Sequence, residues 1–236
     1  MKELYSNAIT DQSLSELNEF ARWYNEMLGN YPVIVGGWAV YCYTKGLGSK
    51  DIDVVFLGDA AKHKTLFDYF MAHGYNERRR SFFDKEFVKL NNDIEIIIDA
   101  VSSNRTIIFE GRKARLPWSW AVKHSSLYAI GSSKIYIPAI ELLMTYKLGA
   151  ILGRNLQLRT GLEFDYYRSK LWKDVYDVVS LSNLKINQKN INSFLAKSGL
   201  DEYKDEILAV IDDNFDDEIR SLIKDASLDR IIELLA

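Results

Sequence analysis

The sequence predicts an α+β protein: a small mixed β-sheet domain flanked by helices, followed by a C-terminal helical bundle. Up to Ile137, short apolar and β-branched segments alternate with helical patterns, which is typical of a sheet covered by helices. From Pro138 onward the apolar residues recur with a helical period. We therefore expect two domains, over residues 1–137 and 138–236.

Composition and charge narrow the class of protein. A chain of 236 residues with 47% hydrophobic content can bury a sizeable core. Its formal net charge of −3 argues against a surface built wholly for nucleic acid, while leaving a local basic groove open. The single cysteine, Cys42, fits a reducing compartment. The longest nearly apolar run, residues 32–43, falls short of the roughly 20 residues that cross a bilayer. We expect a cytoplasmic protein with no membrane partner.

Helix and strand patterns alternate in the first part of the chain. A helical period that stops at Gly29-Asn30 is followed by an apolar run that ends in Gly36-Gly37. The glycine pair predicts a turn between a strand and a helix. The expected elements are helix 11–28, strand 33–35, helix 38–43, strand 52–57 and helix 61–73.

Strand patterns then dominate up to residue 137, and helices follow. Segments 87–90 and 94–101, around a polar turn at residues 91–93, predict a hairpin. We expect short strands around Pro117-Trp118, a last strand at 135–137, and a solvated charged loop at Glu77-Arg78-Arg79-Arg80 rather than a basic wall. The expected helices are 139–152, 162–181 and three shorter ones within 190–236.

Two carboxylates stand out at the start of the second predicted strand. Asp51 and Asp53 flank one apolar residue, so their side chains share a face of the strand, about 6 to 7 Å apart. Like charges at that spacing repel, and a hard divalent cation such as Mg²⁺ or Mn²⁺ is the common remedy, because it takes carboxylate and phosphate oxygens. The same Asp-x-Asp pattern also occurs by chance on solvated strand starts.

The glycine pair lies upstream of these carboxylates. At Gly36 and Gly37 the missing β-carbons would let backbone N–H groups approach a phosphate at the start of a helix. A Gly-Gly pair by itself is usually only a turn. Its value as a signal comes from its combination with Asp51-Ile52-Asp53.

That combination resembles a known superfamily. Gly36-Gly37-Trp38-Ala39 after an apolar strand, with thirteen residues (38–50) before Asp51-Ile52-Asp53, is similar to the signature of DNA polymerase β-type nucleotidyltransferases. The aminoglycoside and lincosamide nucleotidyltransferases and the AbiEii toxin-like group are the most similar members. Many polymerase-type members have a serine after the first glycine, so this chain departs from their pattern around Trp38.

The resemblance implies an activity. Such enzymes move a nucleoside monophosphate from an NTP to a hydroxyl of a small molecule, an RNA or a protein, with Mg²⁺ or Mn²⁺, and release pyrophosphate. The alternative is a noncatalytic nucleotide-binding module, or a toxin-antitoxin component with an antitoxin partner. The acceptor and the preferred NTP stay open.

A third carboxylate is expected on a neighbouring strand. Glu95 and Asp99 share parity, so both lie on one face of their predicted strand. The resemblance favours Asp99, which would share the metal with Asp51 and Asp53 or take the proton of the attacking hydroxyl. Glu95 is then a rim residue or the partner of a basic side chain.

The helical half carries a weaker part of the resemblance. A helix with Lys147 and a later Arg154, followed by Lys173-Asp174, is similar to the AbiEii-like pattern. There the helix lysine and this aspartate line the nucleotide cleft, which implies nucleotide-binding roles for Lys147 and Asp174. The alternative is that Asp174 and Asp177 belong only to exposed i,i+4 pairs, with Lys170 and Lys173 respectively.

Overall fold

The computed structural model describes residues 2–57, 60–79, 85–91, 93–161 and 163–236. The chain divides into two compact units. One, here called the sheet unit, comprises residues 3–106 and 117–138. The other, the helical unit, contains residues 107–116 and 139–236. In the described part of the chain, every helix is too short or too polar to cross a lipid bilayer.

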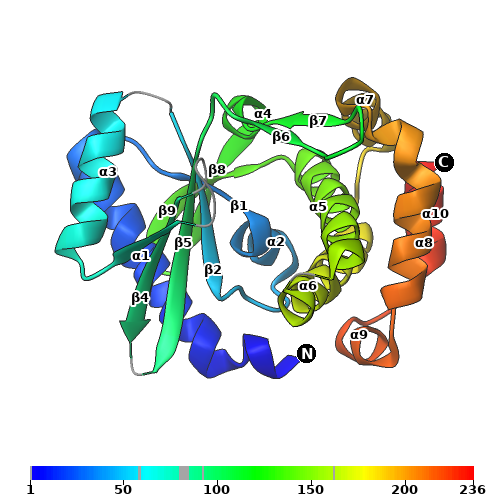
Figure 1. The fold of residues 1–236 in the computed structure, drawn as a ribbon, viewed down its shortest axis with the longest axis horizontal. Helices are drawn as coiled ribbons and strands as arrows, with labels where there is room; N and C mark the ends of the chain where they lie inside the picture. The colour runs from blue at the N-terminus through cyan, green and yellow to red at the C-terminus, as the bar shows by residue number, and fades with distance from the viewer. Residues whose placement is uncertain (1, 58–59, 80–84, 92, 162) are drawn as a thin grey trace. The chain divides into compact units, whose positions relative to one another are not determined.

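A mixed sheet is the framework of the sheet unit (Figure 1). Within the described residues its strand order is β3-β4-β5-β2-β1-β9-β8. At its centre β2 runs parallel to β5 and antiparallel to β1, and β1 runs parallel to β9. The strands are β1 (Val33–Val35), β2 (Asp51–Phe56), β3 (Asn76–Arg79), β4 (Lys85–Asn91), β5 (Ile94–Ser102), β8 (Ser125–Ile130) and β9 (Ser133–Pro138). A separate pair joins β6 (Thr106–Ile108) and β7 (Arg115–Pro117).

Two long helices cover one face of this sheet. Helix α1 (Asn7–Leu28) and helix α3 (Ala60–Ala72) meet through stacked rings, with the centroids of Phe20 and Phe70 5.6 Å apart. Phe70 in turn lies 4.2 Å from Phe87 of β4. The fully buried Ile52, Ile96 and Ile98 complete the apolar side of the central strands. The helices α2 (Gly36–Thr44) and α4 (Ser119–Lys123) are shorter.

A buried polar group ties α1 to the sheet. Glu16 of α1 accepts a hydrogen bond from the Tyr75 hydroxyl at 2.8 Å and from the Lys89 ammonium of β4 at 2.7 Å. Burial raises the pKa of Tyr75 above its usual range, and the charge of Glu16 adds to this effect. The hydroxyl therefore stays protonated at neutral pH and serves as a donor.

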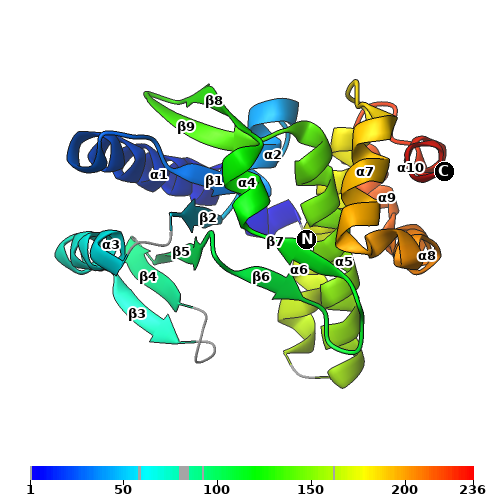
Figure 2. The same cartoon turned by 90° about the horizontal axis from the view of Figure 1, so that it is seen from above.

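The helical unit is built around one helix pair. Helices α5 (Ile140–Thr160) and α6 (Phe164–Ser182) lie side by side (Figure 2). Buried residues form long runs in both helices, such as 171–182 of α6, which is buried on all sides. The remaining helices are α7 (Gln188–Ser198), α8 (Lys204–Asn214), α9 (Asp217–Leu222) and α10 (Leu228–Leu235), with short 3₁₀ segments at Lys2–Tyr5 and Leu200–Tyr203.

The α+β class, the central hairpin and the long helices confirm the sequence predictions, and several local ones are wrong. Residues 76–79 form an edge strand rather than a charged loop, because they pair with β4 and an edge tolerates charged side chains. Arg80 lies outside the described residues. Residues 119–123 are helical where strands were expected. Helix α2 begins at Gly36, without the separate glycine turn that was predicted. Within 190–236, the described residues form more helices than the three predicted.

We predict that Glu16→Gln lowers the free energy of unfolding by about 1–3 kcal/mol, since it removes a charged acceptor from the buried Tyr75 hydroxyl and the half-buried Lys89 ammonium. Urea denaturation of the whole chain measures this. Glu19→Gln, on the same helix, is the matched control. The Glu19 side chain is 52% exposed, and its carboxylate is 3.8 Å from the His73 ring, which is longer than a hydrogen bond. Its substitution should therefore change the free energy of unfolding by less than about 0.5 kcal/mol. Equal effects of the two substitutions would contradict a stabilising role for the Glu16 contacts.

Candidate functional site

Three predicted carboxylates come together on one face of the sheet. The parallel register of β2 and β5 places Asp53 directly beside Asp99, and Asp51 beside Ile97. Neighbouring strands are about 4.8 Å apart, and residues two apart on a strand share a face. Asp51, Asp53 and Asp99 therefore line the face opposite to the one covered by α1 and α3. Asp51 is buried, and Asp53 and Asp99 are half-buried.

The alternative third carboxylate, Glu95, has basic partners. Its Oε2 accepts from Arg78 at 3.2 Å, and its Oε1 lies 3.8 Å from the Lys50 ammonium. This corresponds to the interpretation of Glu95 as the partner of basic side chains. The register beside Asp53 favours Asp99 as the third member.

Gly36 adjoins the carboxylates directly. It is the first residue of α2, with a φ of 64°, a left-handed conformation that favours glycine. A β-carbon built there would collide with the Asp53 carboxylate, so the absence of a side chain is what lets this carboxylate lie against the backbone. The N-terminal end of a helix also stabilises a nearby negative charge.

Trp38 does not bring its bulk to the carboxylates. Its indole is 2% exposed, and Nε1 donates to the Ser13 hydroxyl of α1 at 3.0 Å. The bulky side chain of Trp38 therefore packs against α1. The backbone at Gly36 lies beside the Asp53 carboxylate.

The chemistry of the donors fits a hard divalent cation. Carboxylate oxygens are the ligands Mg²⁺ prefers, and it is commonly held by one or two carboxylates together with substrate phosphates. Within the described ranges, no group of three or more His, Cys, Asp or Glu side chains is placed to hold a metal ion. Asp51, Asp53 and Asp99 fit the mode in which the substrate supplies the other ligands.

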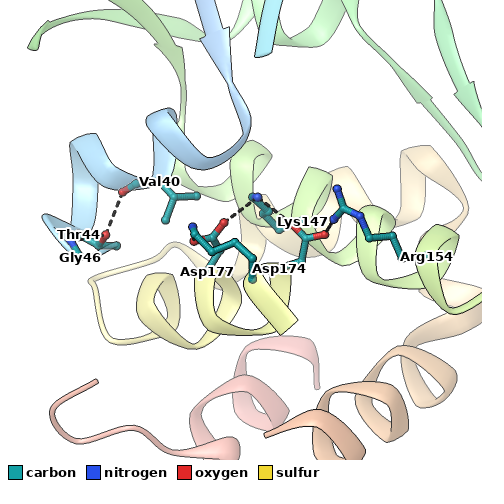
Figure 3. A network of polar contacts seen from close by, with 8 residues as sticks. Val40, Thr44, Gly46, Lys147, Arg154, Asp174 and Asp177 are labelled. Atoms are coloured by element: carbon teal, nitrogen blue, oxygen red, sulfur yellow. Dashed lines mark hydrogen bonds and ion pairs between the residues drawn. The ribbon is translucent and has the colours of Figure 1, made fainter. Parts of the chain in front are cut away.

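In the helical unit, Lys147 and Asp174 belong to a buried charge network (Figure 3). The Lys147 ammonium lies between two carboxylates of α6, 2.8 Å from Asp174 and 2.7 Å from Asp177. Asp177 also accepts from Lys173 at 2.5 Å, and Asp174 forms an ion pair with Arg154. Charges thus alternate along the network: Lys173, Asp177, Lys147, Asp174 and Arg154.

This network changes how the helical residues are interpreted. Lys173 and Asp177 do form an i,i+4 pair, but both side chains are buried, so the pair is not the exposed one considered from sequence. Lys170 lies over the ring of Tyr166. Sequence reasoning missed the contact between Lys147 and Asp177, because it depends on how the two helices pack against each other.

Comparison with known proteins adds a structural similarity. No family model matches the sequence, and no curated protein matches it. The structure is similar to that of an antigenic nucleotidyltransferase-like protein from Paracoccidioides brasiliensis, with 13% sequence identity and a TM-score of 0.47, over 86% of this chain and 93% of that one. We base the assignment of function on the carboxylates of the sheet unit.

Gly36→Ala should destabilise the fold and displace Asp53. Gly29→Ala is a matched control, because Gly29 has the same φ of 64° with no atom near a built β-carbon. The control should cost about 1–2 kcal/mol of unfolding free energy for the left-handed backbone alone. Gly36→Ala should cost at least about 1 kcal/mol more, by urea denaturation, because it also overpacks. Equal costs would show that the Asp53 carboxylate moves aside freely.

Lys147→Ala should lower the free energy of unfolding by about 1–3 kcal/mol, because it removes the cation that two buried carboxylates share, while Arg154 and Lys173 still pair with them. Lys170→Ala, on the neighbouring helix and outside the alternating network, is the control and should cost below about 1 kcal/mol. Thermal and urea denaturation compare them. A Lys147→Ala protein as stable as the control would show that the network is not a stability element.

Proposed function

We propose that this protein is a metal-dependent nucleotidyltransferase that moves a nucleoside monophosphate from an NTP to a hydroxyl acceptor. The observation that carries the proposal is the placement of Asp53 beside Asp99, with Asp51 on the same face. Carboxylates held at such spacing are stable when they share a cation, and phosphoryl transfer is the chemistry that such sites serve. The sequence resemblance around Gly36-Gly37 and Asp51-Ile52-Asp53 supports the same activity.

Each residue has a role in this proposal. A bound Mg²⁺ or Mn²⁺ would supply Lewis-acid charge that neutralises phosphate oxygens. Asp51 and Asp53 would hold it, and the backbone amides at the start of α2, at Gly36 and Gly37, would approach a phosphate. Asp99, beside Asp53, would accept the proton that the acceptor hydroxyl loses.

The transfer requires no reactant besides the NTP and the acceptor hydroxyl. The acceptor oxygen forms a bond to the α-phosphorus of the NTP, and the bond from this phosphorus to the oxygen that bridges to the β-phosphate breaks. Pyrophosphate leaves with the electron pair. The hydroxyl proton passes to Asp99 and then to solvent.

Nucleotide-binding roles for Lys147 and Asp174 stay a prediction from the resemblance. Because Lys147 already lies between Asp174 and Asp177, a triphosphate would have to compete with two carboxylates for its ammonium. The measurement that decides is NTP affinity. An unchanged affinity in folded Lys147→Ala or Asp174→Asn would remove these residues from the nucleotide site.

The experiment incubates the protein with Mg²⁺ or Mn²⁺ and each α-labelled NTP, offering tRNA, mixed protein and aminoglycoside-like acceptors. Asp51→Asn, Asp53→Asn and Asp99→Asn should each lower transfer by at least about 100-fold, since each removes a metal ligand or the base. Asp93→Asn, in the exposed turn between β4 and β5, is the control and should transfer normally.

The outcomes separate the competing functions. Label on an acceptor that depends on all three carboxylates supports the proposal and identifies the acceptor class. Metal-dependent NTP binding without transfer favours the noncatalytic module, including a toxin-antitoxin component with an antitoxin partner. Absence of both binding and transfer contradicts the proposal.

A further inference from the structure

A row of charged residues crosses four strands in register. Arg78 of β3 is opposite Glu86 of β4, Glu86 is opposite Asp99 of β5, and Asp99 is beside Asp53 of β2. Residues opposite one another share a face of the sheet, with β-carbons about 5 Å apart. The row therefore extends the proposed site by two residues, Glu86 and Arg78.

Glu86 is held firmly at its place in the row. Its side chain is 2% exposed, and Oε2 accepts from the Arg78 Nε at 3.0 Å. Arg78 also donates from its terminal nitrogen to Glu95 at 3.2 Å, so its guanidinium bridges β4 and β5. A buried carboxylate requires such a partner, because an uncompensated one costs several kcal/mol, on the order of 3–5.

The order of charges in the row has an electrostatic consequence. Glu86 lies next to Asp99, while Arg78 lies one strand farther from it. The Arg78–Glu86 pair therefore turns its negative member towards the carboxylates. The Lys50 ammonium lies on the same side of the sheet, 3.8 Å from Glu95.

We infer that the Arg78–Glu86 pair is a further functional element of this face: Glu86 adds negative charge beside Asp99, Arg78 limits it, and together they set the affinity for a divalent cation. The inference rests on the metal-binding part of the proposed function. It predicts effects of opposite sign for the two residues, which a purely structural ion pair would not give.

A double-mutant cycle on the whole chain tests this, with Mn²⁺ alone as the probe and electron paramagnetic resonance to count the free ion. Glu86→Gln removes one negative charge beside Asp99 and keeps the positive charge of Arg78. It should weaken Mn²⁺ binding about tenfold, on the order expected for one unit charge acting on a divalent ion across several ångströms. Arg78→Gln should tighten binding severalfold. The double variant should return to within about threefold of the parent protein.

Two controls separate charge from structure. Glu16→Gln also removes a buried glutamate bonded to a β4 cation, Lys89, but on the opposite face of the sheet, and should leave Mn²⁺ affinity unchanged. Asp53→Asn should abolish binding. Weakening by both single substitutions with the double variant weakest, or no effect of Glu86→Gln, would overturn the inference. Should Glu86→Gln fail to fold, tightening by Arg78→Gln still tests it.

The result is also distinct from failure of the proposed function. Mn²⁺ binding that needs Asp53 but ignores Glu86 and Arg78 contradicts this inference alone. No Mn²⁺ binding by the parent protein contradicts both. The predicted cycle without any nucleotidyl transfer supports the inference and contradicts the catalytic proposal.

Discussion

The parallel pairing of β2 with β5 is the constraint on which the rest of the sheet unit depends. It places Asp53 beside Asp99 although like charges at that spacing repel. The apolar side of the same strands supplies the force that holds them there: Ile52, Ile96 and Ile98 are fully buried, each contributing about 1.5–3 kcal/mol by leaving water. A slip of one residue would expose these side chains and bury the carboxylates, so burial on one face fixes the position of charge on the other.

Ionisable side chains are arranged differently in the two units. In the helical unit, cations and carboxylates alternate from Lys173 to Arg154, so each charge has a neighbour of the other sign. This network links α5 to α6 through the ion pairs of Lys147 and Arg154. In the sheet unit, carboxylates are neighbours across adjacent strands, and Gly36 leaves room for one of them. A group of carboxylates on one face of a sheet is where a cationic ligand is expected.

The sequence predicted the features that depend on residues close together in the chain. The shared face of Asp51 and Asp53 follows from strand alternation, and the hairpin from its polar turn. The pairing of Lys147 with Asp177 depends on how α5 packs on α6, which no period in either helix encodes. The strand at residues 76–79 was missed because its charged side chains gain their strand character only from the register with β4. The position of Glu86 beside Asp99 likewise depends on the pairing of β4 with β5, and neither strand's sequence pattern predicts it.

The position of Arg78 unites two requirements of a sheet. An edge strand must discourage further pairing, and charged side chains such as those of β3 do so. A row of carboxylates must also end in a countercharge if its last member is buried, as Glu86 is. An arginine on the edge strand meets both needs, because its long side chain reaches inward while its exposed side remains hydrated. The charge of the row can then be adjusted at the edge without disturbing the apolar core beneath its centre.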